Sequence, residues 1–321
     1  MYSRLGFRAA VNLCAVTFVC VSSVFAAGGL SVKSVERIPG TRSPGLIFFP
    51  GTNFVFTQQS AGSYGNFTTV VRQDQSSFTI VTEGWANQFI ADGDKIYALC
   101  SMAGTPTYTS VIKEYDLNTG KFIADVAEGK KVDAIYVYRG NLYLIRKGFA
   151  ASGGGGGSAI SIQTVSLAGT GEETSRTIDT SVFTGTLGSF ALKIRGLEDA
   201  LYWWVFPQVG SSSCIIKTDL QGGFVDLYEI PSPLDICVIP QRSSLGFVSA
   251  TNRRKGQYIA GFLSLDGAIA RLTTADFSLE GVHIGDYLDY DPVLHAFVIR
   301  GEDRSPSSVP EFFRLRLSEP E

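Results

Sequence analysis

The feature that most constrains the fold of this chain is a repeat of four short apolar segments. From Gly45 onward, six sets of such segments follow one another, each beginning about 42 to 57 residues after the last. That period is typical of the blades of a β-propeller, in which each blade is a four-stranded antiparallel sheet. The sequence therefore predicts an all-β, six-bladed β-propeller, with blades over residues 45–82, 87–127, 132–180, 189–230, 234–274 and 282–317.

The sixth set holds only three apolar segments, because the chain ends there. At the other end, Leu30–Ile38 alternates between apolar and polar residues like a strand and precedes the first set. An N-terminal strand that completes the last blade leaves no exposed sheet edge in the ring. We therefore expect residues 30–38 to be the closing strand of a single domain over residues 27–321.

The N-terminus has the pattern of an export signal. Arg4 and Arg8 precede an apolar stretch that ends at Val24-Phe25-Ala26, where small side chains stand at the positions that a signal peptidase requires. We expect residues 1–26 to be a signal peptide and the mature chain to be periplasmic or extracellular, without a membrane span. The alternative is an uncleaved N-terminal membrane anchor, since the apolar stretch approaches spanning length.

The charge of the chain argues against one class of partner. Cleavage after Ala26 removes two arginines and no acid, which takes the formal net charge from −3 to −5. A nucleic-acid partner favours a basic face. The sequence therefore predicts no nucleic-acid partner.

One short motif resembles known propeller repeats. Tyr115–Lys121 (YDLNTGK) resembles the strand–turn–strand motif of the quinoprotein-like and YVTN-type repeat families, and Thr218–Gly222 (TDLQG) looks related. The resemblance implies a propeller fold and no particular activity. The quinoprotein pattern has a Trp shortly after the glycine, whereas Phe122 and Phe224 stand there in this chain, so quinone chemistry is not implied.

The connections between the second and third segments of the sets are long, and they predict a binding face. They are Ser60–Asn66, Ala103–Thr109, Gly148–Ser158, Pro207–Ser213, Thr251–Gln257 and Gly301–Pro310. In a propeller these connections share one face, and functional groups concentrate on loops held by a rigid scaffold. We expect a protein, peptide or glycan to bind there, with candidate residues Tyr64, Tyr108, Arg253, Arg254, Lys255 and Arg304. The alternative is that Gly- and Ser-rich loops merely tolerate insertion.

Asp286, Asp289 and Asp291 form the densest acidic cluster of the sequence. Ca²⁺ prefers several oxygen ligands, and six-bladed propellers similar to lactonases and phytases hold Ca²⁺ near their axis. Asp286 and Asp289 have opposite parity on a strand and are expected on opposite faces, so a solvated turn is the alternative. No cofactor is expected otherwise, and Ca²⁺ is the one that the sequence leaves open.

No catalytic constellation is evident in the sequence. His283 and His295 are the only histidines, too few for a three-histidine zinc site, and no Gly-x-Ser-x-Gly motif supplies a nucleophile. The first hypothesis is therefore a non-enzymatic binding or scaffold module that uses the face of the long loops. The second is a Ca²⁺-dependent hydrolase or lactonase of the six-bladed type.

Two further groups of residues each have two interpretations. Tyr202, Trp203 and Trp204 either fill the space between two blades or stack on a sugar. The predicted mature chain keeps Cys100, Cys214 and Cys237. Either Cys214 and Cys237 pair, because they fall in adjacent blades, or all three are buried free thiols.

Overall fold

The computed structural model describes residues 30–38, 46–49, 54–60, 66–72, 77–82, 85–102, 109–130, 132–149, 158–168, 174–179, 190–207, 213–230, 233–264, 271–303 and 311–318. The predicted signal peptide, residues 1–26, lies outside these ranges. Over the described ranges, no helix has both the length and the apolar character that crossing a bilayer requires.

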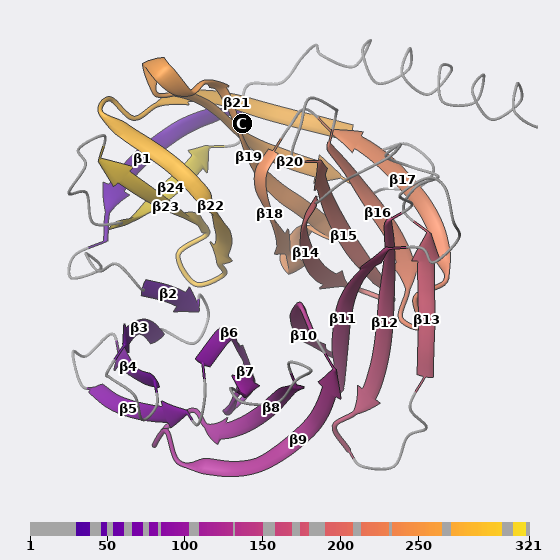
Figure 1. The fold of residues 1–321 in the computed structure, drawn as a ribbon. Coiled ribbons are helices and arrows are strands. Elements are labelled where there is room, and N and C mark those ends of the chain that lie inside the picture. The colour runs from indigo at the N-terminus through magenta and orange to yellow at the C-terminus, as the bar shows by residue number, and fades with distance from the viewer. Residues whose placement is uncertain are drawn as a thin grey trace, which may run out of the picture.

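The fold is all-β and consists of four-stranded antiparallel sheets arranged about a common centre (Figure 1). Each predicted blade range overlaps the strands of one observed sheet. Five sheets are made of strands consecutive in sequence. They are β2 (Leu46–Phe49), β3 (Phe54–Ser60), β4 (Asn66–Arg72) and β5 (Ser77–Thr82); β6 (Trp85–Asp92), β7 (Lys95–Met102), β8 (Thr109–Asp116) and β9 (Phe122–Lys130); β10 (Ala134–Tyr138), β11 (Asn141–Phe149), β12 (Ser158–Ser166) and β13 (Thr174–Asp179); β14 (Phe190–Leu197), β15 (Ala200–Pro207), β16 (Ser213–Asp219) and β17 (Phe224–Ile230); and β18 (Pro233–Ile239), β19 (Ser244–Asn252), β20 (Gln257–Ser264) and β21 (Arg271–Ser278).

The sixth sheet combines the two ends of the chain. Its strand order is β1-β24-β23-β22, where β1 is Ser31–Arg37, β22 is Val282–Asp291, β23 is Ala296–Asp303 and β24 is Glu311–Ser318. β1 pairs antiparallel with β24, from Ser31 opposite Ser318 to Arg37 opposite Phe313. The segment expected to add an outer strand to the last sheet therefore does so.

The apolar core is divided into clusters that lie between consecutive sheets. Wherever the structure describes their side chains, the second strands are buried on both faces, which explains why their sequences are apolar throughout rather than alternating. In β15, Trp203 packs with β11 and β12 of the preceding sheet, whereas Tyr202 and Trp204 pack with β18 and β19 of the following sheet. All three side chains are almost fully buried. The interpretation that they fill the space between sheets is thus confirmed.

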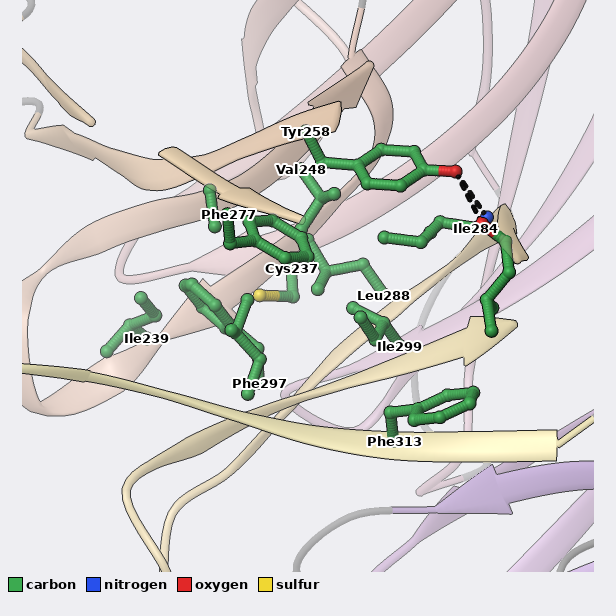
Figure 2. Packing of buried hydrophobic residues seen from close by; sticks show 13 residues of the cluster. Cys237, Ile239, Val248, Tyr258, Phe277, Ile284, Leu288, Phe297, Ile299 and Phe313 are labelled. Carbon is green, nitrogen blue, oxygen red and sulfur yellow. Dashed lines mark hydrogen bonds between the residues drawn. The ribbon is translucent and has the colours of Figure 1, made fainter. Parts of the chain in front are cut away.

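One of these clusters joins the fifth and sixth sheets (Figure 2). Cys237, Phe297 and Leu288 belong to its buried residues. The Tyr258 hydroxyl donates to the carbonyl oxygen of Val282 at 3.1 Å and accepts from the amide of Ile284 at 3.0 Å. A buried phenol thereby satisfies two backbone groups of β22, as burial of polar groups requires.

Cys237 forms no disulfide in the part of the chain that the structure describes. It is a free thiol and is fully buried, as is the side chain of Cys100. Burial raises the pKa of the Cys237 thiol well above its ordinary value, and a thiol in such surroundings is unreactive. The interpretation that Cys237 pairs with Cys214 is therefore wrong, and Cys237 fits the alternative of a buried free thiol. The side chain of Cys214 lies outside the described residues.

The motif that resembles propeller repeats forms a turn closed by its aspartate. Asp116 Oδ1 accepts from the amides of Asn118 and Thr119 at 3.0 and 2.7 Å, and Gly120 adopts a positive φ of 71°. Asp219 Oδ1 accepts in the same way from the amides of Gln221 and Gly223 at 2.9 and 2.6 Å. The motif is explained by turn formation, since Asp stabilises such turns and Gly tolerates positive φ.

Candidate functional site

The candidate site lies on the innermost strands, which are the first strands of their sheets. β6, β10, β14, β18 and β22 contact one another in that order and lie nearest the centre of the arrangement (Figure 1). Each has a sheet neighbour on one edge only, so the backbone groups of the other edge lack a partner in the sheet. Those groups need hydrogen bonds from elsewhere wherever water is excluded.

Two polar side chains supply such bonds between neighbouring innermost strands. Gln88 of β6 bonds both backbone groups of Ile135 in β10, with distances of 3.0 Å to its carbonyl oxygen and 2.9 Å from its amide. The Tyr136 hydroxyl of β10 accepts from the Gly196 amide of β14 at 2.7 Å. Polar residues in these apolar strands thus tie adjacent sheets together.

Among the side chains that the structure describes, Asp235 is the most deeply buried charged group of the innermost strands. Its side chain is 1% exposed and pairs with the ammonium group of Lys193 in β14, which is 25% exposed. The same carboxylate accepts from the amides of Ile236 and Leu288 at 2.7 and 2.8 Å. A buried carboxylate is tolerated only when it is paired and hydrogen-bonded in this way. One side chain therefore links β14, β18 and β22.

Arg195 and Asp289 complete what we call the central cluster, which is Tyr136, Lys193, Arg195, Asp235 and Asp289. Arg195 of β14 reaches past β18 to β22, where its Nη2 donates to the Leu288 carbonyl oxygen at 3.4 Å. Its Nη1 donates to the Ile194 carbonyl oxygen at 3.0 Å. Asp289 Oδ1 accepts from the Tyr290 amide at 2.9 Å. Both side chains belong to half-buried residues, so solvent reaches the cluster.

The charges of the cluster act on one another. Burial raises the pKa of Asp289 from its ordinary value of 3.8 to about 6, and the nearby positive charge of Arg195 offsets only part of this effect. Burial raises the pKa of Tyr136, again partly opposed by Arg195. Burial acts to lower the pKa of Arg195, but Asp235 and Asp289 outweigh it, so the pKa lies above its ordinary value. Arg195 is therefore a permanent cation, whereas Asp289 titrates near pH 6.

Replacing Asp289 by Asn is expected to stabilise the fold at pH 7.5 by about 1–3 kcal/mol. The pKa is raised in the folded state, so between about pH 4 and 6 the folded protein holds a proton that the unfolded chain releases, and wild-type stability falls as the pH rises through this window. The Asp289→Asn variant lacks that penalty, and its gain should vanish below about pH 4. Urea unfolding of both proteins at pH 4, 6 and 7.5 measures the difference in stability. If the free energies of unfolding of the two proteins change with pH in parallel, the prediction is wrong.

Replacing Tyr136 by Phe is expected to destabilise the protein by about 1–2 kcal/mol, because the partly buried Gly196 amide loses its acceptor. Tyr138 is the matched control, since its hydroxyl donates to the Glu198 carbonyl oxygen at an exposed position. Tyr138→Phe should change the stability by no more than about 0.5 kcal/mol. Equal effects of the two variants in chemical denaturation would show that the Tyr136 bond has no special role.

The predicted binding-face residues are only partly described. Arg253, Arg254 and Lys255 form the exposed 3-10 turn η3 (Arg253–Lys255) between β19 and β20. The Asn252 side chain accepts from the Lys255 amide at 3.2 Å, and Gly256 ends the turn with a positive φ. Three further candidates lie outside the described residues, namely Tyr64, Tyr108 and Arg304.

The three candidate metal ligands occupy different surroundings. Asp289 belongs to the central cluster, whereas Asp291 is buried and closes the β22–β23 turn by accepting from the amides of Val293 and Leu294, both at 3.0 Å. The side chain of Asp286 lies outside the described residues. Within the described ranges, no group of three or more His, Cys, Asp or Glu side chains is placed to hold a metal ion.

The expectation from strand parity about Asp286 and Asp289 remains a prediction, because the side chain of Asp286 lies outside the described residues. The register of β22 with β23 shifts between Ile284 and Leu288, so an irregularity separates the regular parts of the strand. Side chains alternate only along a regular strand, and a bulge breaks the alternation. Parity alone is therefore not sufficient to assign the faces of these two residues.

Sequence reasoning missed most of the central cluster. It gave no functional role to Lys193, Arg195 and Asp235, although the sequence contains a signal that they share a site. In Phe190–Leu197 (FALKIRGL) and Pro233–Ile239 (PLDICVI), charged residues interrupt strands that are otherwise apolar. A charge inside a buried strand requires a partner, so these positions were candidates for a shared cluster.

Comparison with known proteins places the fold in a class. A scan of protein-family models and a search of curated proteins gave no match. Among solved structures, the subtype N10 neuraminidase-like protein of A/little yellow-shouldered bat/Guatemala/060/2010 matches with a TM-score of 0.53 and 10% identity over 90% of this chain and 99% of that one. A protein of unknown function from Dyadobacter fermentans DSM 18053 matches with a TM-score of 0.52 and 9% identity over 91% and 99% of the two chains.

A third structure, the hydrazine synthase of Kuenenia stuttgartiensis, matches with a TM-score of 0.51 and 11% identity over 83% of this chain and 78% of that one. The chain thus has an all-β, propeller-like fold, as the repeat predicted. At these identities the likeness concerns the fold alone, because one fold supports many functions.

Proposed function

We propose that the protein is an exported six-bladed β-propeller, closed by β1, that binds an acidic segment of a protein or peptide through the face of its second-to-third-strand loops. Six four-stranded sheets, the pairing of β1 with β24 and the core clusters between consecutive sheets support the closed ring. The apolar N-terminal stretch supports export. Binding without catalysis is the function that such a scaffold with a basic loop supports best.

The observation that carries this proposal is the basic tip formed by Arg253, Arg254 and Lys255. It stands on a chain whose net charge is negative, and all three residues are exposed. The tip is held in one conformation by the Asn252 cap and by Gly256, where a Cβ would lie 2.4 Å from the Leu279 carbonyl oxygen. A fixed cluster of like charges costs less entropy on binding than a flexible one and steers an oppositely charged partner.

A photo-crosslinking amino acid tests the proposal. Placed at Arg254, it should capture a specific partner in the producing cells, with a yield that falls as salt screens the charges. Gln221 is the matched control because it is also an exposed turn residue, between the third and fourth strands of its sheet. Equal adducts at both positions, or adducts at Gln221 alone, would refute the assignment of the face.

Calcium distinguishes the alternative function. Anything that binds the native state alone raises its unfolding midpoint with concentration. The binding proposal expects the same midpoint in Ca²⁺ and in EDTA. A reversible rise with Ca²⁺ that disappears in Asp289→Asn would instead favour a Ca²⁺-dependent hydrolase or lactonase, and would justify a screen with lactones and phosphate esters.

A further inference from the structure

The central cluster retains hydrogen-bonding capacity after its structural bonds have been counted. A guanidinium group has five N–H donors, and Arg195 uses Nη1 and Nη2 for the backbone carbonyl groups of Ile194 and Leu288. The Tyr136 hydroxyl accepts from Gly196, and its own proton has no acceptor among the described residues. Asp289 Oδ2 likewise has no partner in the described part of the chain, because only Oδ1 accepts from Tyr290.

These three groups lie close enough to act on one another. The Tyr136 hydroxyl bonds the amide of Gly196, which is next to Arg195, and Arg195 Nη2 bonds the carbonyl oxygen of Leu288, which is next to Asp289. The charge of Arg195 accordingly affects the pKa values of both Tyr136 and Asp289. They come from β10, β14 and β22, and solvent reaches all three residues because they are only half-buried. Donors and an acceptor from separate sheets thus converge where the innermost strands meet.

The charge balance of the cluster separates two of its members from the others. Lys193 and Asp235 form an ion pair and neutralise each other. Among the described residues, Arg195 and Asp289 form no ion pair within 4 Å, although each lies in the field of the other. Partly buried charges without direct partners are costly, and a ligand that contacts both removes that cost.

We propose that Arg195, Tyr136 and Asp289 form a binding site for a small carboxylate that carries a hydroxyl or amino group next to its carboxyl group. The guanidinium fork and the phenolic proton donate to the ligand carboxylate, since planar N–H pairs match that group. Asp289 accepts from the neighbouring hydroxyl or ammonium group. The site is distinct from the loop face and does not depend on the protein partner proposed above.

Four probes test the ligand chemistry on the purified wild-type protein. Acetate offers the carboxylate alone, glycolate adds a hydroxyl group, glycine adds an ammonium group, and chloride controls for ionic strength. Thermal unfolding and saturation-transfer NMR are followed up to about 100 mM, because very small ligands bind weakly. Glycolate or glycine should raise the midpoint more than acetate, and acetate more than chloride. The same midpoint with all four probes, with no transfer to ligand protons, overturns the proposal.

Three variants assign the groups. Arg195→Gln and Arg195→Lys should weaken binding of every carboxylate by at least about tenfold, and the Lys variant keeps the charge if the Gln variant fails to fold. Asp289→Asn is expected to be well folded and should remove the preference for glycolate or glycine over acetate. Lys121→Gln, which removes an exposed cation from the turn between β8 and β9, is the control and should bind like wild type. Unchanged carboxylate binding in both Arg195 variants overturns the site, even if a partner is captured at the loop face. If the Arg195 variants lose binding and no partner is captured, the site stands and the loop-face proposal fails.

Discussion

Replacing Trp203 by alanine is expected to lower the free energy of unfolding by about 3–5 kcal/mol. Its side chain is fully buried between the third and fourth sheets, packed with Tyr143, Ile145 and Ile160 of the preceding sheet. The indole Nε1 also donates to Thr218 Oγ1 at 2.8 Å, so the substitution leaves both a cavity and a buried hydroxyl group without its partner. Urea or guanidinium unfolding of wild type and variant measures the loss.

Val225→Ala is the matched control for this substitution. Val225 lies in β17 of the same sheet and is 53% exposed, so truncation should cost no more than about 0.5 kcal/mol. A loss of less than about 1 kcal/mol for Trp203→Ala would mean that the third and fourth sheets do not pack as described. Trp203→Phe keeps most of the ring volume, so its loss of unfolding free energy should lie between those of Val225→Ala and Trp203→Ala.

Replacing Asp235 by alanine is the second substitution with a large expected effect, also about 3–5 kcal/mol. It leaves Lys193 without its counter-ion and the amides of Ile236 and Leu288 without their acceptor. Removing one partner of a buried pair is costly because the other charge stays buried and uncompensated. The effect should appear in chemical denaturation at neutral pH.

A double-mutant cycle with Lys193→Met isolates the ion pair. The double variant removes both charges, so it should be more stable than the sum of the single losses implies, with a coupling of about 0.5–3 kcal/mol. The exposed pair of Arg139 and Asp199 is the control, since its side chains are 49% and 88% exposed. Asp199→Ala should leave the unfolding midpoint unchanged. Additive losses in the cycle would show that the pair makes no net contribution.

The strands could be predicted from the sequence because their signal is local. The strand Lys95–Met102 lies within the blade predicted over residues 87–127. Tyr202, Trp203 and Trp204 fill the space between sheets, which is one of the two roles that their sequence allowed. The turns are also encoded by residues close in sequence, since Gly120 and Gly222 adopt positive φ angles of 71° and 84° that favour glycine. These features depend on neighbours a few residues apart in the chain.

The central cluster depends on neighbours far apart in the chain. Arg195 reaches Leu288, and Gln88 bonds Ile135, across separations that no local pattern encodes. The register shift in β22 is likewise a feature that the alternation of the sequence does not reveal. Which polar residues of the innermost strands meet is therefore decided when the sheets assemble.

The sequence by itself determined the strand segments, the turns between them and the burial of the second strands on both faces. Hydrophobic periodicity and the backbone preferences of Gly and Asp suffice for that. Only the tertiary structure decided that Asp235 pairs with Lys193, and that Arg195 bonds the carbonyl oxygen of Leu288. The reason is physical: packing of separate sheets brings their free edges together, and unpaired backbone groups and charges then select their partners there.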